Sequence, residues 1–331
     1  MTRHAPSRPA YPRWGLHIAI GLVVGGACAW LTLQQAVSQS AIAAMTHVEP
    51  RWLALAALLH AVALAVRVLR WRCLLAHLVP LSYGTFARTM VVSYGINLLL
   101  PARLGELFRM ETFKRKYGVA RAWSASAIMI ERMLDMVTAV VCVSFGLLLA
   151  ATPPETLLVA LSSMGAALFG LLCANLVVLV WLSRQPWIRR WRYARRHLAM
   201  IGPAVQVMGK AAFVIAIGAT LTTAALETSA FSAVLLGLGV MVTPGLAALV
   251  FGAASLSAFL PAAPGFVGSY QYAFMLAVMQ FGIDGALGVA AATLVQLALF
   301  GPVALGALAI LAVGARLYWH FLPVSARPTS S

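Results

Sequence analysis

Acidic residues are scarce in this sequence. Its 331 residues include only 8 Asp and Glu against 24 Lys and Arg, and all charged residues together make up 10% of the chain. Hydrophobic residues make up 62%. Soluble globular proteins carry about 25% charged residues, so this composition excludes that class and predicts a polytopic membrane protein.

Motifs for metals and disulfides are also missing. The four cysteines include no CxxC pair, and the seven histidines include no His-x-x-x-His pair. Disulfide frameworks and zinc sites commonly show such spacings. The sequence therefore gives no support for metal chemistry, and we expect no cofactor.

The basic residues are concentrated in a few stretches. Of the 24 Lys and Arg, 22 lie in five clusters at 3–13, 67–88, 103–121, 184–210 and 316–327. Lys and Arg between spans stay on the cytoplasmic side, so the net charge of +16 reports topology first and attraction to anionic lipid headgroups second. We expect both chain termini in the cytoplasm and no nucleic-acid partner.

These clusters divide the apolar sequence into about six full membrane spans. We place them at 15–33, 52–69, 122–150, 157–182, 211–236 and 286–314. The predicted fold is all-α and polytopic, with one transmembrane domain over 15–316 between cytoplasmic tails at 1–14 and 317–331. At the end of the second span, Arg67, Arg70, Trp71 and Arg72 are expected to anchor the helix at the membrane interface.

Two further apolar segments, 85–116 and 246–282, are interrupted rather than continuous. Their breaks contain Pro101 and Gly105 in the first segment, and Pro261, Pro264, Gly265 and Gly268 in the second. Basic residues flank the first segment, whereas none lies between positions 210 and 316. We interpret both as re-entrant helical hairpins, the first opening to the cytoplasm and the second to the outside. An ordinary cytoplasmic loop is the alternative for the first.

The two breaks resemble each other. Residues 100–105 and 260–265 both read Leu-Pro-Ala-x-x-Gly. Paired interrupted segments in the two halves of a membrane protein are the usual sequence sign of an inverted-repeat transporter with its site near the bilayer midplane. We therefore predict an inverted repeat whose two turns meet at mid-depth.

The span at 122–150 carries three charged residues, Glu131, Arg132 and Asp135. Glu131 and Asp135 are four residues apart and so share one face of a helix. Ionisable residues at such depth are costly, usually face the protein interior and indicate a function. An internal salt bridge that only fixes packing is the alternative interpretation.

Three motifs together resemble a known family. They read Asn97-x3-Pro101-x-Arg103-x-Gly105-Glu106-x2-Arg109, then Glu131-Arg132-x2-Asp135, then Pro264-Gly265-x2-Gly268. This order and spacing resembles the lysylphosphatidylglycerol synthase transmembrane-region family over roughly residues 15–316. In that family the resemblance implies a flippase-like domain that moves a modified phospholipid between leaflets, while a separate soluble domain performs aminoacyl transfer. Because this chain ends at Ser331 after a short polar tail, we expect no lysyl transfer.

The third motif departs from the family pattern. Phe266 and Gln271 stand where the family commonly has a glycine and a carboxylate. This weakens the case for a proton or cation site in the second hairpin, where Tyr270 and Gln271 remain candidate lining residues.

We expect a translocase of a phospholipid or lipid-linked headgroup in the bacterial inner membrane, a transporter rather than an enzyme. Guanidinium groups bind phosphate bidentately, which makes Arg103 and Arg109 the favoured phosphate ligands. The remaining candidates for headgroup binding are Asn97, Glu106, Glu131, Arg132 and Asp135. The alternatives are a membrane-embedded transferase with Glu131 or Asp135 as base, and a scaffold for envelope-lipid synthesis enzymes.

Overall fold

A computed structural model of the chain describes residues 48–99, 104–150, 209–259 and 264–321, together with Trp30, Met45 and Thr46. Within these ranges the chain is helical, with no strand. The long helices are α3 (Pro50–Leu75), α6 (Arg121–Leu148), α9 (Gly209–Gly237) and α12 (Gly285–Phe321). The short ones are α4 (Tyr83–Leu99), α5 (Leu104–Tyr117), α10 (Pro244–Ser257), the 3-10 turn η2 (Pro264–Phe266) and α11 (Ser269–Met279).

Three of the long helices, α3, α9 and the 285–313 part of α12, are long and apolar enough to cross a membrane. The fourth, α6, has 28 residues, about 42 Å at 1.5 Å per residue, but its three central charged residues distinguish it from the others. Large apolar side chains are exposed on all four, among them Leu58, Val141, Leu221 and Leu305. Such continuous apolar exposure is typical of a surface that faces lipid.

The predicted number of six spans stays a prediction, because 157–182 and nearly all of 15–33 lie outside the described residues, as do the loop at 184–197 and the tail at 1–14. The α12 helix runs to residue 321, past the predicted end of the last span at 314. Pro302 lies within the helix without ending it.

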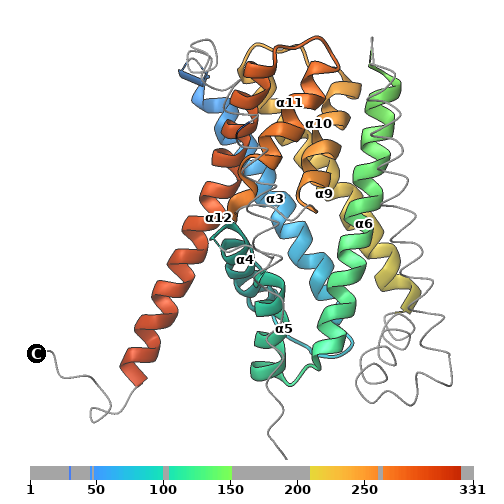
Figure 1. Cartoon of the computed structure of the whole chain (residues 1–331). Coiled ribbons are helices and arrows are strands. Elements are labelled where there is room, and N and C mark those ends of the chain that lie inside the picture. The colour runs from blue at the N-terminus through green and yellow to red at the C-terminus, as the bar shows by residue number, and fades with distance from the viewer. Residues whose placement is uncertain are drawn as a thin grey trace, which may run out of the picture.

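The short helices form two pairs, one at each end of the bundle (Figure 1). The α4–α5 pair occupies the lower half of the view and corresponds to the segment predicted at 85–116. The α10–α11 pair occupies the upper half and corresponds to the segment at 246–282. The inverted repeat itself remains a prediction, but the two pairs enter from opposite ends, as that hypothesis requires.

The inner ends of the two pairs meet in the middle of the bundle. The α4 helix contacts η2, and a Cβ atom built on Gly265 would lie 3.5 Å from the carbonyl oxygen of Leu98. Leu100, Pro101, Arg103 and Pro261, which belong to the breaks, lie outside the described residues. The described residues beside the two breaks nevertheless lie at the same level, near the middle of the long helices (Figure 1).

Each half of the bundle has its own apolar core. The lower core is built around three aromatic rings, with the Trp71 and Phe113 centroids 4.6 Å apart and the Trp71 and Phe86 centroids 5.0 Å apart. The upper core joins α9, α10, α11 and α12 around buried residues such as Phe231 and Phe274. The interface-anchor prediction is therefore wrong for Arg70 and Trp71, which are buried because α3 turns them towards α5 and α6, while Arg72 is exposed.

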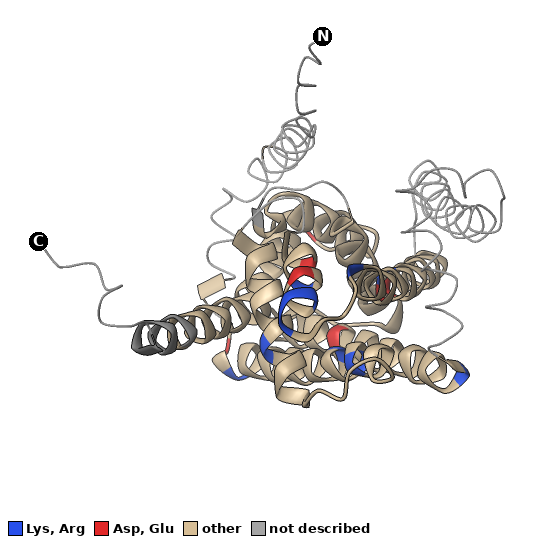
Figure 2. Ribbon diagram, turned by 90° about the horizontal axis from the view of Figure 1, so that it is seen from below, with Lys and Arg blue, Asp and Glu red and all other residues tan. Residues whose placement is uncertain are grey.

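Charged residues separate into two populations. Most of the exposed basic residues lie at the lower end, where α3 and α5 end and α6 and α9 begin; they are Arg72, Lys114, Arg115, Lys116, Arg121 and Lys210. Arg88 on α4 is exposed as well, and Arg51 is exposed in the first turn of α3, where it pairs with Glu49. The second population lies inside the bundle, where acidic and basic positions are interleaved between helices (Figure 2). The exposed group has the distribution expected of a cytoplasmic face.

Candidate functional site

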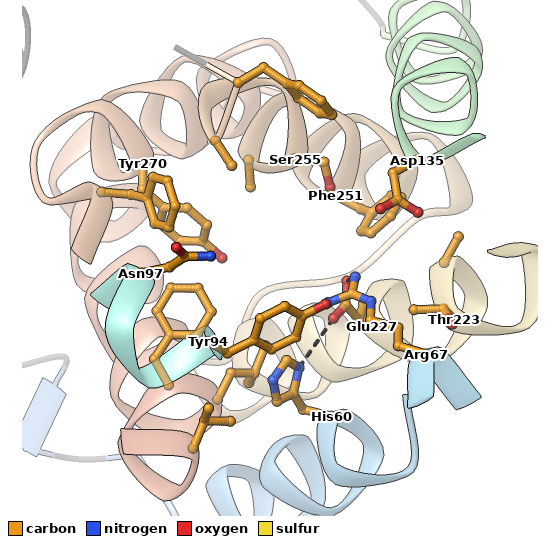
Figure 3. A pocket seen from close by; sticks show the side chains of 18 of the residues that line it. His60, Arg67, Tyr94, Asn97, Asp135, Thr223, Glu227, Phe251, Ser255 and Tyr270 are labelled. Carbon is orange, nitrogen blue, oxygen red and sulfur yellow. Dashed lines mark hydrogen bonds and ion pairs between the residues drawn. The ribbon is translucent and has the colours of Figure 1, made fainter. Parts of the chain in front are cut away.

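A cavity of about 180 Å³ lies where the two helix pairs meet. At about 30 Å³ per water molecule it has room for roughly six waters, which is enough for a small polar group but not for a whole lipid. Every described helix from α3 to α12 contributes residues to its walls, and Figure 3 shows many of their side chains. It is lined by the charged residues Arg67, Glu106, Arg132, Asp135 and Glu227 and by His60.

One side of the cavity is formed by a histidine, an arginine and a carboxylate. Glu227 of α9 accepts a hydrogen bond of 2.7 Å from Nη2 of Arg67, and its other oxygen lies 3.2 Å from Nδ1 of His60. His60 and Glu227 are both buried. Both partners of Glu227 come from α3, at positions seven residues apart that fall on the same helix face.

The opposite side is formed by Asp135 and Arg132 of α6. Asp135 is held by two hydrogen bonds from Arg70 of α3, at 2.6 and 3.2 Å. Arg132 has looser partners, with Nε 3.4 Å from Glu106 and Nη1 3.8 Å from Asp135. Because these contacts are longer than good charge-assisted hydrogen bonds, the Arg132 guanidinium is the one on this side with most capacity for a further anion.

A second pair lies behind this wall. Nη2 of Arg109 donates to Glu131 over 3.0 Å, both side chains are almost fully buried, and the guanidinium lies 4.8 Å from the ring centroid of Trp71. Arg70 also approaches Glu131, at 3.9 Å. This pair does not line the cavity, so it fixes α5 against α6 and α3 and supports the residues that do.

The first break is stabilised by Asn97 and Gly105. The Asn97 side-chain oxygen accepts a hydrogen bond of 2.8 Å from the backbone N–H of Gly105. A Cβ atom at position 105 would lie 1.9 Å from the carbonyl oxygen of Ser93. Only glycine therefore allows the start of α5 to pack this closely on α4, and the contact brings Glu106 to the cavity.

The second break is stabilised by two glutamines. Gln271 accepts a hydrogen bond of 2.8 Å from the backbone N–H of Gly268 and donates one of 2.5 Å to Gln296. Gln296 in turn donates to the carbonyl oxygen of Gly265 over 3.1 Å. Gly265 has φ of 68°, in the left-handed region that glycine adopts without strain.

Aromatic rings cover the upper part of the cavity. Tyr94, Phe231, Phe251, Phe259, Phe266, Tyr270 and Phe300 all line it. The Tyr270 ring lies 6.4 Å from Phe231 and 6.1 Å from Phe300, so these three rings form a connected apolar part of the wall. The cavity is thus amphipathic in cross-section, as Figure 3 shows.

The comparison with known proteins agrees with the sequence motifs. The family model described as "Lysylphosphatidylglycerol synthase TM region" matches residues 18–306. The chain belongs to this family. No curated protein matches it significantly. Membership makes this chain a membrane protein of a family tied to lipid modification or translocation, and associated with membrane lipids.

The family motifs supply only part of the cavity. Four predicted candidates line it, namely Asn97, Glu106, Arg132 and Asp135, and Tyr270 does so from the second pair. Arg109 and Glu131 are placed behind the wall, and Gln271 is engaged at the second break rather than in the cavity. Arg103 lies outside the described residues.

Two departures from the family pattern have clear structural places. Phe266, where the family commonly has glycine, has φ of 60° and is the one non-glycine residue with positive φ in the described part of the chain. Its side chain lines the cavity, so this chain accepts backbone strain at a position that narrows the site. Gln271 makes neutral hydrogen bonds where a carboxylate would add charge.

Sequence reasoning missed His60, Arg67 and Glu227 as a group. His60 and Glu227 stand in apolar stretches, Arg67 belongs to a basic cluster, and the three are separated by up to 167 positions in a chain whose helix pairing the sequence does not state. The available signal was Glu227 itself, an ionisable residue deep in a span. No group of His, Cys, Asp and Glu suited to a metal ion occurs among the residues with described positions.

Proposed function

We propose that this protein moves the headgroup of a phospholipid or lipid-linked substrate between the leaflets of the bacterial inner membrane. The observation that carries the proposal is the amphipathic cavity at the junction of the two helix pairs. A charged headgroup cannot cross hydrocarbon without large cost, and an internal polar site at mid-depth divides that crossing into two shorter steps.

The size of the cavity supports movement of the headgroup alone. About 180 Å³ accommodates a phosphate with a small substituent, while two acyl chains exceed it many times over. The long helices expose apolar faces, along which the acyl chains can remain in the surrounding lipid. We therefore expect the chains to travel outside the bundle while the headgroup passes through it.

The contacts of Arg109 and Arg132 change which of the predicted residues we assign as the phosphate ligand. Arg132 lines the cavity and has only long contacts to Glu106 and Asp135, whereas Arg109 is enclosed with Glu131. We infer that Arg132 binds the phosphate and that Arg109 positions Glu131. Arg103 stays a second candidate ligand, since its place in the first break adjoins Gly105.

The orientation follows from the exposed basic residues. Lys114, Arg115, Lys116 and Arg121 surround the junction of α5 and α6, which lies at the lower end of Figure 1. Asp284 belongs to the turn between α11 and α12, which lies at the upper end. By the positive-inside rule the α4–α5 pair opens to the cytoplasm and the α10–α11 pair to the outside. This is the arrangement of a site reachable from both leaflets.

The transferase alternative has less support. It needs a carboxylate free of arginine to act as a base, and both candidates are paired. Glu131 is held by Arg109, and Asp135 accepts two hydrogen bonds from Arg70. A paired carboxylate is a weak base, so the geometry favours binding over proton abstraction.

Arg132→Gln tests the proposal in vesicles containing the purified full-length chain. The assay measures how fast a labelled phosphatidylglycerol becomes accessible to a membrane-impermeant quencher. Loss of a charge-assisted contact of about 1.5–3 kcal/mol predicts a rate at least about tenfold lower, with normal insertion. Arg88→Gln, at an exposed position outside the cavity, is the matched control.

The rate for Arg132→Lys should lie between the rates for Arg132→Gln and Arg88→Gln, because lysine keeps the positive charge but cannot form the bidentate contact of a guanidinium. A wild-type rate in Arg132→Gln would remove this residue from the pathway. No movement by the wild-type protein with any of several headgroups would favour a scaffold for envelope-lipid synthesis enzymes instead.

A further inference from the structure

His60 lies in a position that suggests more than a packing role. It is 5% exposed in an apolar stretch of α3, lines the cavity, and places Nδ1 3.2 Å from a carboxylate oxygen of Glu227. Imidazole is the side chain whose charge ordinarily changes near neutral pH. A buried imidazole that touches both a carboxylate and a cavity is a natural place for a proton to enter and leave.

Glu227 has two partners on α3, one at each carboxylate oxygen. One oxygen accepts from Arg67 at 2.7 Å, and the other faces His60. While His60 is neutral, Arg67 is the only full positive charge that contacts this carboxylate among the described residues. Protonation of His60 gives Glu227 a second cation, which lowers the cost of releasing the Arg67 guanidinium towards the cavity.

The charges around His60 are otherwise balanced within the described part of the chain. The ion-pair network of the described interior contains four guanidiniums and four carboxylates, those of Arg67, Arg70, Arg109 and Arg132 and of Glu106, Glu131, Asp135 and Glu227. One added proton makes this network positive by one, and one bound monoanion returns it to neutral. Net charge is costly at this depth, so the two ligands stabilise each other.

Groups on each neighbouring helix also face this corner. The ring of Phe300 on α12 lies 6.4 Å from the imidazole and contributes no charge. The titratable and charged groups that line the same cavity are Arg67 on α3, Tyr94 on α4, Glu106 on α5, Arg132 and Asp135 on α6, Glu227 on α9 and Tyr270 on α11. Of these, Glu227 is the one in direct contact with the imidazole.

We propose that His60 and Glu227 form a proton site, at which one proton from solvent binds together with one phosphate-bearing lipid headgroup in the cavity. The proposal rests on the proposed function and deepens it by naming what is carried with the headgroup. Protonated His60 pairs with Glu227, and Arg67 is then free to turn to the phosphate beside Arg132. The added proton and the bound monoanionic headgroup together carry no net charge, and they move together. Proton binding and anion binding then strengthen each other equally.

The test is calorimetric titration of the purified full-length chain in uncharged detergent at pH 7.5. The probe is dihexanoylphosphatidylglycerol, and the titration is repeated in two buffers of different ionisation enthalpy, which yields the number of protons taken up per probe bound. We expect uptake of about one proton per probe bound, and an affinity for the probe that falls as the pH rises.

Three variants separate a proton site from a structural role. His60→Gln should bind the probe with no proton uptake and with an affinity that no longer depends on pH. Glu227→Gln frees Arg67 permanently, so it should bind without uptake yet keep its affinity at pH 8.5. His77→Gln is the control, because His77 is exposed beside Trp123 and should keep the wild-type uptake.

Binding that persists in both variants without proton uptake cannot arise from misfolding, and equal elution on size exclusion confirms that each variant is folded. Binding by the wild-type protein with no proton uptake, or uptake unchanged in His60→Gln, would overturn this proposal and leave the proposed function standing. Failure to bind any probe would overturn both. Equal binding and proton uptake with inorganic phosphate would overturn the assignment to a lipid headgroup.

Discussion

Removing the carboxylate of Glu131 should destabilise the protein strongly. In Glu131→Gln the Arg109 guanidinium stays enclosed, with 0% of the residue exposed, after losing its 3.0 Å partner. Leaving one member of a buried pair uncompensated costs about 3–5 kcal/mol. The Trp71 ring at 4.8 Å offsets only part of this, since a cation–π contact contributes about 2 kcal/mol when desolvated and is already present in the wild type.

The assay is thermal unfolding of the detergent-purified protein, followed by intrinsic tryptophan fluorescence. At roughly 2 °C per kcal/mol for a chain of this size, the midpoint should fall by about 6–10 °C. Glu131→Gln combined with Arg109→Gln should recover much of this loss, because both charges are then gone. Combination with Arg132→Gln should not, since Arg132 contacts Glu106 and Asp135 rather than Glu131.

Glu111→Gln provides the matched control. It is the same substitution on a carboxylate that also pairs with arginines, Arg115 and Arg121, but in a solvent-exposed setting where such pairs contribute little. Its midpoint should stay close to that of the wild type. A wild-type midpoint for Glu131→Gln, or a double variant with Arg109→Gln that loses the sum of the two single effects, would refute the buried-pair reasoning.

Other features allow sharper tests of single contacts. Gly105→Ala should disrupt the α4–α5 contact and greatly lower the yield of folded protein, because its Cβ would meet Ser93 O at 1.9 Å, whereas Gly84→Ala, with open space around it, should be silent. In a background without native cysteines, Asp284→Cys should react with an impermeant thiol reagent on intact cells and Arg115→Cys only after permeabilisation; labelling of both from outside would reverse the topology. Hydrogen bonds from Arg121 and Arg115 lower the pKa of Glu111 to about 2, from 4.5. Its small contribution to stability should therefore be complete above pH 4.5 and lost as the pH falls towards 2, so that wild type and Glu111→Gln unfold alike at the lower limit.

The sequence predicted those parts of the arrangement that depend on neighbouring residues in the chain. Proline and glycine located the two interruptions within a few residues, and the charges of 122–150 indicated a helix face that turns to the protein interior. The breaks at Gly105 and Gly265 follow from backbone geometry that few other residues permit. Asn97, Glu106, Arg132 and Asp135 could be nominated because they stand beside those breaks or deep in a span.

Partner choice could not be predicted in the same way. Arg132 follows Glu131 in the sequence, yet Glu131 pairs with Arg109 and Arg70, which come from two other helices. Arg67 belongs to a basic cluster that suggested a membrane-surface anchor, but its helix turns it inward to Glu227, 160 positions away. Such pairings depend on how helices pack, which charge counts and periodicity do not determine.

The central claim is that the headgroup passes through the cavity between the two helix pairs. Ser255 of α10 lines that cavity and is labelled in Figure 3, so Ser255→Trp places a large ring in the site while adding no charge. Ser144→Trp, at an exposed position on α6, adds the same ring outside it. The decisive measurement is the rate of labelled phosphatidylglycerol movement in vesicles that contain equal amounts of each folded variant. We predict wild-type movement for Ser144→Trp and loss of movement for Ser255→Trp; movement at the wild-type rate with the cavity filled would contradict passage through it.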